Sequence, residues 1–368
     1  MNVKNYLAIF TILISTTLFS RSMEFNSCKS YVKVEKNLEK GEEFGLLAME
    51  KEPDNAYIPY FMARFIYRPQ KMIEKAGEMY LKAINTTDTK LERPFKTGAG
   101  KNQIWIKTVH DAVATQGVDW FNYGLEEEKI RNYKLAIKYF KMASMFDPNL
   151  KAQCYNAMAF IFFNDNNPDS TFHYINKAID ISSNGDNNEL SIELKMNKIG
   201  FLSSQKRIDE AFEIYETLPK NELSAIQRTQ IFELYKNNNN CDQAIKMGNE
   251  IFPVLENDFS TPMSVLSGFA FNMAACYLSN GTIIYNEIIE NWAKLGDSNA
   301  PPELIESYLL KAEQCKESYS SAKDYFRLSL DYEEGEGEVA KKYKKDVRKK
   351  IRDLDNEIIS VLEGYLSK

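Results

Sequence analysis

The feature that most constrains the fold is a pattern of large and small side chains over residues 117–150. The pattern consists of a large residue, a small residue one turn later, a small–aromatic–small series at helical spacing and a closing proline: Trp120, Gly124, Ala136, Phe140, Ala143 and Pro148. Gly124 and Ala136 are small enough to let two helices approach closely, and Pro148 cannot continue a helix. A single pair of helices leaves an apolar face uncovered, so the pattern predicts that several such pairs stack.

Related patterns recur on both sides of this segment. Ala143 and Ala178 are 35 residues apart, and Ala211 and Ala244 are 33 residues apart. Ala159 and Tyr215 are expected at further structural positions of the repeat. The pattern resembles the tetratricopeptide repeat, a helical hairpin of 34 residues. The resemblance covers about residues 34–330. It implies an all-α fold: a right-handed α-solenoid of stacked antiparallel helical hairpins.

The repeat divides the chain into four parts. Residues 23–55 are expected to form a partial repeat that caps the N-terminal end, and residues 56–330 form the solenoid. Residues 85–116 interrupt the repeat: we expect a loop over Asn85–Asn102, which has four Thr, one Pro and two Gly, and then an extra helix over Ile104–Val113. Residues 331–368 read as an acidic hinge and a C-terminal amphipathic helix.

The first residues have the organisation of a secretory signal. Lys4 precedes an apolar run from Tyr6 to Phe19, which is short for a membrane span, and Ser22 follows as a cleavage point. We therefore expect residues 1–22 to be a signal peptide, and the protein to lie in the periplasm or against the outer envelope. A retained anchor is the alternative, as is lipidation of Cys28, although the residues before Cys28 match a lipobox poorly.

The composition argues against several function classes. A net charge of −6 does not suit a nucleic-acid-binding protein. The two histidines, His110 and His173, have no metal-ligand spacing, and residues 97–101 depart from the phosphate-loop pattern. We therefore expect a protein that is not an enzyme and that has no cofactor or metal. The basic run Lys341–Arg352 is interpreted first as a solvated helix face, with contact with anionic lipid or an acidic partner as the alternative.

The resemblance implies a binding surface on the concave side, formed by the first helix of each hairpin. The expected partner-binding residues are Tyr60, Arg64, Tyr67, Phe121, Leu125, Asn156, Phe160 and Phe163. Such a groove suits a peptide or helix of another protein, so we expect an interaction scaffold of the cell envelope. A solute- or glycan-binding surface protein is the second hypothesis. These side chains could instead pack against residues 85–116 or the terminal helix, which would fill the groove from within.

Overall fold

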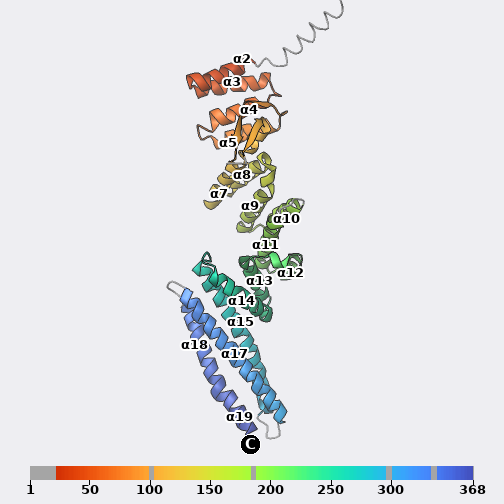
Figure 1. Cartoon of the computed structure of the whole chain (residues 1–368), viewed down its shortest axis with the longest axis vertical. Helices are drawn as coiled ribbons and strands as arrows, with labels where there is room; N and C mark the ends of the chain where they lie inside the picture. The colour runs from red at the N-terminus through yellow and green to blue at the C-terminus, as the bar shows by residue number, and fades with distance from the viewer. Residues whose placement is uncertain (1–21, 99–102, 184–187, 296–300, 333–337, 368) are drawn as a thin grey trace, which may run out of the picture. The chain divides into compact units, whose positions relative to one another are not determined.

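The computed structural model describes residues 22–98, 103–183, 188–295, 301–332 and 338–367, and Figure 1 shows them as a series of helices. Within these residues the only sheet has two strands. The all-α class of stacked antiparallel hairpins is therefore confirmed. The chain divides into two compact units between Ser191 and Ile192, and each unit is described by itself.

Unit 1 consists of successive helical hairpins around one apolar core. Its helices are α2 (Met23–Ser30), the π-helix η1 (Tyr31–Glu35), α3 (Leu38–Lys51), α4 (Tyr57–Met62), the π-helix η2 (Ala63–Tyr67), α5 (Ile73–Ile84), α6 (Val109–Ala114), α7 (Gly117–Lys129), α8 (Tyr133–Phe146), the short 3₁₀ helix η4 (Pro148–Leu150), α9 (Lys151–Asn164) and α10 (Pro168–Ser183). The pairs α2–α3, α7–α8 and α9–α10 pack as hairpins. Residues 23–55, expected to form the N-terminal cap, contain the α2–α3 hairpin.

The strongest sequence motif lies where the hairpins of unit 1 meet. The indole of Trp120 is fully buried, and its ring centroid lies 5.4 Å from that of Tyr80 on α5 and 5.2 Å from that of Phe146 on α8. A Cβ added at Gly124 would lie 2.6 Å from Cε1 of Phe140, so α7 and α8 approach as closely as the small residue allows. The other alanine and tyrosine slots are also buried, at Ala136, Ala143, Ala159, Ala178, Ala211 and Tyr215, whereas Pro148 is exposed and begins η4.

Residues 85–116 differ from the prediction. In place of a loop and a helix from Ile104, the structure has two antiparallel strands, β1 (Lys90–Thr97) and β2 (Ile104–Thr108), and α6 begins only at Val109. The β-branched and aromatic residues of β2 favour a strand. The pairing is irregular between Lys90 and Phe95, where Pro94 has no N–H for the ladder.

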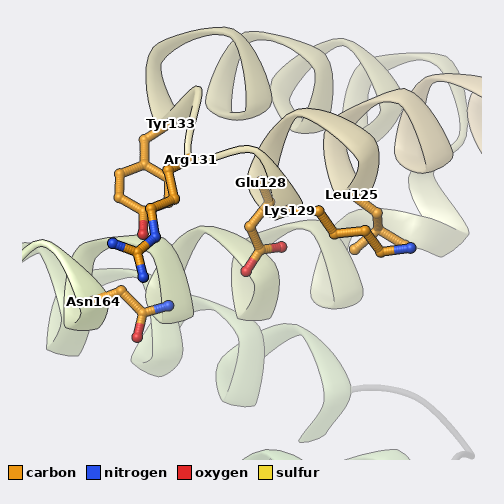
Figure 2. A pocket seen from close by; sticks show the side chains of 6 residues that line it. All are labelled: Leu125, Glu128, Lys129, Arg131, Tyr133 and Asn164. Carbon is orange, nitrogen blue, oxygen red and sulfur yellow. The ribbon is translucent and has the colours of Figure 1, made fainter.

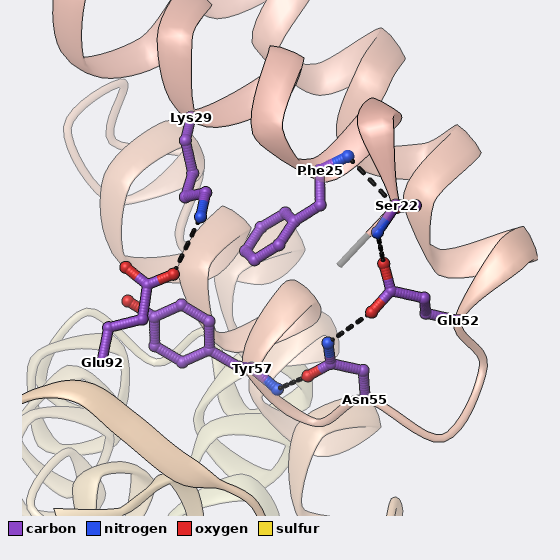
Figure 3. A network of polar contacts seen from close by, with 7 residues as sticks. All are labelled: Ser22, Phe25, Lys29, Glu52, Asn55, Tyr57 and Glu92. Atoms are coloured by element: carbon purple, nitrogen blue, oxygen red, sulfur yellow. Dashed lines mark hydrogen bonds and ion pairs between the residues drawn. The ribbon is translucent and has the colours of Figure 1, made fainter. Parts of the chain in front are cut away.

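Polar contacts attach this β-hairpin and fix the first hairpin of helices (Figure 3). Nζ of Lys29 on α2 lies 2.9 Å from Oε1 of Glu92 on β1. The Glu52 carboxylate, just after α3, accepts a hydrogen bond from the backbone N–H of Ser22 and another from the Asn55 amide at 2.7 Å. Contacts between residues distant in sequence therefore hold the strands, which explains why local periodicity did not predict them.

Unit 2 continues the hairpins and then changes to long helices. Its helices are α11 (Asn188–Ser204, which contains the boundary), α12 (Ile208–Glu216), the 3₁₀ helix η5 (Lys220–Glu222), α13 (Ala225–Asn237), α14 (Cys241–Asn257), α15 (Met263–Glu290), α16 (Trp292–Leu295), α17 (Pro302–Tyr332), α18 (Glu338–Asp353), the π-helix η6 (Leu354–Ile359) and α19 (Ser360–Leu366). Antiparallel α15 and α17 pack along their length, from the Ser267–Ser329 hydrogen bond to the Glu287–Lys311 ion pair.

The expected signal peptide lies outside the described residues except for Ser22, which caps α2. The acidic hinge also lies mostly outside them, at residues 333–337. The C-terminal helix is present as α18, η6 and α19, and it packs on α17 through buried Val347 and Leu354. None of the helices in the described ranges has both the length and the apolar character that a bilayer span requires.

Candidate partner-binding surface

Tyr60 and Tyr67 belong to the core of unit 1, and this corrects their assignment to a partner-binding face. Each side chain is 2% exposed. The Tyr60 ring centroid lies 6.0 Å from that of Tyr80, and the Tyr67 hydroxyl donates to Oε1 of Glu42 at 2.8 Å. Burial raises the pKa of both phenols, and the neighbouring Glu42 carboxylate raises that of Tyr67 further. Neither ring has surface left for a partner.

Arg64 lies beside the β-hairpin. Its side chain is exposed, but the guanidinium carbon lies 5.0 Å from the ring centroid of Phe95 on β1, and Nη1 donates to the Tyr60 hydroxyl. A cation over an aromatic ring is attracted to it. The β-hairpin thus packs against the helix that was expected to line the groove.

The other expected residues lie on α7 and α9 and keep part of their surface accessible. They are half-buried: Phe121 and Leu125 on α7, and Asn156, Phe160 and Phe163 on α9. The Phe121 ring centroid lies 5.3 Å from that of Phe140, so its inner edge is held by the core of its own hairpin. Partly exposed rings with a fixed orientation are suited to bind an apolar side chain at low entropic cost.

A hollow of about 580 Å³ adjoins Leu125. Figure 2 shows the side chains that line it, from the end of α7, the start of α8 and the end of α9: Leu125, Glu128, Lys129, Arg131, Tyr133 and Asn164. Lys129 and Arg131 are exposed, whereas Glu128 is half-buried and burial raises the pKa of its carboxyl. The hollow therefore has two cationic groups and one partly desolvated acid beside the apolar surface of Leu125.

Local chain geometry places these charges. Arg131 has a φ of 61°, so the chain turns sharply after α7, and the N–H of Arg131 donates to the Glu128 carbonyl at 2.8 Å. The turn connects Lys129 at the end of α7 to Tyr133 at the start of α8, and both residues line the hollow, at opposite ends of it in Figure 2. Sequence patterns do not predict five of these residues as site residues: Glu128, Lys129, Arg131, Tyr133 and Asn164. Their only sequence signal is that they lie at helix ends, and which ends meet is decided by hairpin stacking.

Comparisons with known proteins give a likeness of fold class. No family model matches the chain, and no curated protein matches it. The chain is an all-α protein of stacked helical hairpins, and solved structures of tetratricopeptide-repeat proteins and related helical proteins resemble it.

Three of these solved structures illustrate how distant the likeness is. Pseudomonas aeruginosa PilF is 14% identical over 65% of this chain and 93% of its own, with a TM-score of 0.31. A tetratricopeptide repeat protein from Parabacteroides merdae is 13% identical over 89% of this chain and 100% of its own, also with a TM-score of 0.31. A Rap protein, solved in complex with Competence and Sporulation Factor, is 14% identical over 90% of this chain and 98% of its own, with a TM-score of 0.36. Similarity this low carries no information about a partner.

Proposed function

We propose that this protein is a non-enzymatic scaffold that binds a segment of another protein along α7 and α9 of unit 1. The observation that carries the proposal is the hollow at the ends of these helices, where the half-buried Leu125 adjoins Glu128, Lys129 and Arg131. A mixed apolar and charged surface of this kind is typical of helix or peptide recognition. Phe121, one turn before Leu125, extends the apolar part of the surface.

The expected partner segment follows from the chemistry of the lining. An apolar side chain would rest on Phe121 and Leu125, and separate carboxylates of the partner would face Lys129 at one end of the hollow and Arg131 at the other. The raised pKa of Glu128 indicates that its carboxylate is partly desolvated, so a donor of the partner would gain by pairing with it. Arginine and aromatic residues are the types that most often dominate binding energy at interfaces.

The first test uses affinity capture with matched variants. A tagged chain is crosslinked in the native envelope fraction, and the captured proteins are quantified by mass spectrometry for wild type, Leu125→Glu and Lys129→Glu/Arg131→Glu. We expect one protein to be lost in both variants. Met145→Glu is the apolar control because Met145 is exposed near the C-terminal end of α8, away from the hollow, and Lys134→Glu/Lys141→Glu on α8 is the charge control. Capture that is unchanged in the two site variants, or equally reduced in the controls, contradicts the proposal.

We also propose that the chain is exported and acts in the cell envelope. The support is the N-terminal sequence, in which Lys4, the apolar run and Ser22 follow the order of a signal peptide. N-terminal sequencing of the protein from its native cells is expected to begin at Met23. A lipid-modified N-terminus at Cys28 would replace this proposal with a lipoprotein, and an intact N-terminus would replace it with a retained anchor or an unexported protein.

A further inference from the structure

Unit 2 places two of the five cysteines side by side. Cys241 is the first residue of α14, and Cys276 lies in the middle of α15. Both side chains belong to one apolar cluster, in which Cys241 is 9% exposed and Cys276 is fully buried. Burial raises the pKa of the Cys276 thiol, and a hydrogen bond with the Cys241 thiol raises this pKa further. The two thiols are therefore neighbours in the folded chain.

Contacts on both sides of Cys276 fix this approach. Asn272, Cys276 and Asn280 follow one another at intervals of four residues, so they share one face of α15. Nζ of Lys236, near the end of α13, donates to Oδ1 of Asn272 at 2.8 Å. Nδ2 of Asn280 donates to Oδ1 of Asp242, the second residue of α14, at 2.6 Å. The face that carries Cys276 is thus held against the turn between α13 and α14 from both sides.

The turn itself fixes the position of Cys241. Asn239 has a φ of 56°, and the backbone N–H of Asn240 donates to the Tyr235 carbonyl at 2.9 Å. The Asn240 side chain accepts a hydrogen bond from the backbone N–H of Gln243 at 3.2 Å, which caps the N-terminus of α14. Cys241 therefore begins a capped helix, and little rearrangement is needed for its sulfur to meet that of the neighbouring cysteine.

We propose that Cys241 and Cys276 form a disulfide bond that ties the start of α14 to the middle of α15. The oxidant is a disulfide of a small thiol or of an oxidoreductase. The Cys241 thiolate attacks one sulfur of this oxidant and releases the first thiol, and the Cys276 thiolate then attacks the Cys241 sulfur and releases the second. The two cysteines lose two protons and two electrons, and the oxidant gains them as two thiols.

Burial decides when this bond forms and how long it lasts. Only a thiolate attacks a disulfide, and the raised pKa of Cys276 disfavours its thiolate in the folded protein. Oxidation therefore takes place while the chain folds, before the thiols are covered. The same burial then shields the bond from reductants. Disulfides persist in oxidising compartments, so formation of this bond in cells rests on the export proposed above, whereas the pairing of the two cysteines does not.

The disulfide constrains a helix that also forms one wall of an apolar hollow. This hollow of about 370 Å³ lies between α15, α17 and α18. Ala275 and Leu278 flank Cys276 in the chain and line the hollow, together with Phe326 of α17 and Tyr343 of α18. Because the bond prevents α15 from separating from α14, it also keeps this wall of the hollow in place.

The first test maps the pairing after refolding. The full chain is reduced and unfolded in urea, refolded in a mixture of reduced and oxidised glutathione, alkylated with N-ethylmaleimide in urea, and digested with trypsin without reductant. Lys246 is a trypsin site between the two cysteines, so after cleavage residues 237–246 and 247–294 stay joined only by a disulfide. We expect mass spectrometry to find this joined pair in most of the chain, and the other three cysteines alkylated. Separate peptides, or bonds shared at random among the five cysteines, overturn the proposal.

The second test compares urea unfolding of each variant before and after reduction, so that packing lost by the substitution itself cancels. Reduction is expected to lower the urea midpoint of the wild type by about 1 M. We expect Cys241→Ala to abolish this difference. Cys315→Ala is the matched control, because Cys315 is buried in the same unit and its thiol donates to the Gly281 carbonyl at 3.1 Å, and it should retain the difference.

Two results of the second test would overturn the proposal: equal midpoints for the reduced and oxidised wild type, or a difference that persists in Cys241→Ala. Neither test depends on export or on the surface of α7 and α9. Failure of the disulfide therefore leaves the proposed function untouched, and failure of the proposed function leaves the disulfide untouched.

Discussion

At the scale of single residues, the absence of one side chain sets the distance between α7 and α8. A Cβ at Gly124 would lie 2.6 Å from one carbon of the Phe140 ring and 2.7 Å from the next. The ring is fully buried and cannot swing aside. We expect Gly124→Ala to lower the free energy of unfolding by about 1–3 kcal/mol, measured by urea denaturation followed by circular dichroism.

Gly200 is the matched control for this substitution. It lies within α11, and a Cβ added there would meet nothing within 4 Å. Alanine is a better helix former than glycine, so Gly200→Ala is expected to raise the free energy of unfolding by about 0.5–1 kcal/mol. If both variants lost stability to the same extent, close packing would not explain the glycine at position 124.

The buried cysteines are expected to be unreactive in the folded protein. Burial raises the pKa of the Cys28 and Cys154 thiols from the ordinary 9.0 to about 12, and that of Cys315 to about 11. Since the thiolate is the nucleophile, alkylation by iodoacetamide at pH 8 should be slow until urea unfolds the chain. Mass spectrometry of tryptic peptides measures the labelling at each site. Rapid labelling of Cys154 in the native protein would contradict its buried position.

The same pKa shifts predict loss of stability in alkali. The folded state favours the protonated thiol. These thiols therefore contribute to the free energy of unfolding in full below pH 9, and the contribution is lost as pH rises toward the pKa values of the folded state. Tyr139 and Tyr325, whose pKa values burial raises to about 12, act in the same direction. The urea concentration at the unfolding midpoint should therefore be lower at pH 10.5 than at pH 8. Cys154→Ala should show a smaller fall, and an unchanged midpoint in the wild type would refute the linkage.

At the scale of elements, one side of α18 anchors the C-terminal helix to unit 2. Val347 is fully buried in the cluster with α17, whereas Val339, two turns earlier on α18, is 59% exposed. We expect Val347→Ala to cost about 1–3 kcal/mol of unfolding free energy and Val339→Ala less than about 0.5 kcal/mol. Thermal unfolding of the two variants provides the comparison. Similar losses would mean that α18 is not held by this face.

The elements also show where sequence patterns succeed and fail. Large and small residues at spacings of three and four predict α7–α8 and α9–α10 because both partners of each hairpin lie close in sequence. No such pattern predicts the β1–β2 hairpin. Pro94 interrupts the alternation of β1, and the residues that hold the hairpin, Lys29 and Arg64, belong to other elements. The same packing explains why Tyr60 and Tyr67, expected on a groove, belong to the core.

At the scale of the whole molecule, the two units are expected to respond separately to local damage. Stability in stacked hairpins is a sum of units and nearest-neighbour contacts. Gly124→Ala should therefore accelerate amide hydrogen exchange in α7 and α8 without changing α17 and α18, and Val347→Ala should do the reverse. Exchange followed by mass spectrometry tests this, and the double variant should be additive within about 0.5 kcal/mol. Deprotection of α17 by the unit 1 variant would show that the chain unfolds as one cooperative body.

The sequence by itself determined the class of fold: helical hairpins packed through small residues at Gly124, Ala136 and Ala143, and an amphipathic helix at the C-terminal end. It could do so because helix formation and hairpin closure depend on spacings within about 35 residues. The tertiary structure alone decided which aromatic rings are covered, that Phe95 packs over Arg64, and where hollows open beside Leu125 and Tyr343. Each of these depends on contacts between separate elements, and no local period encodes them.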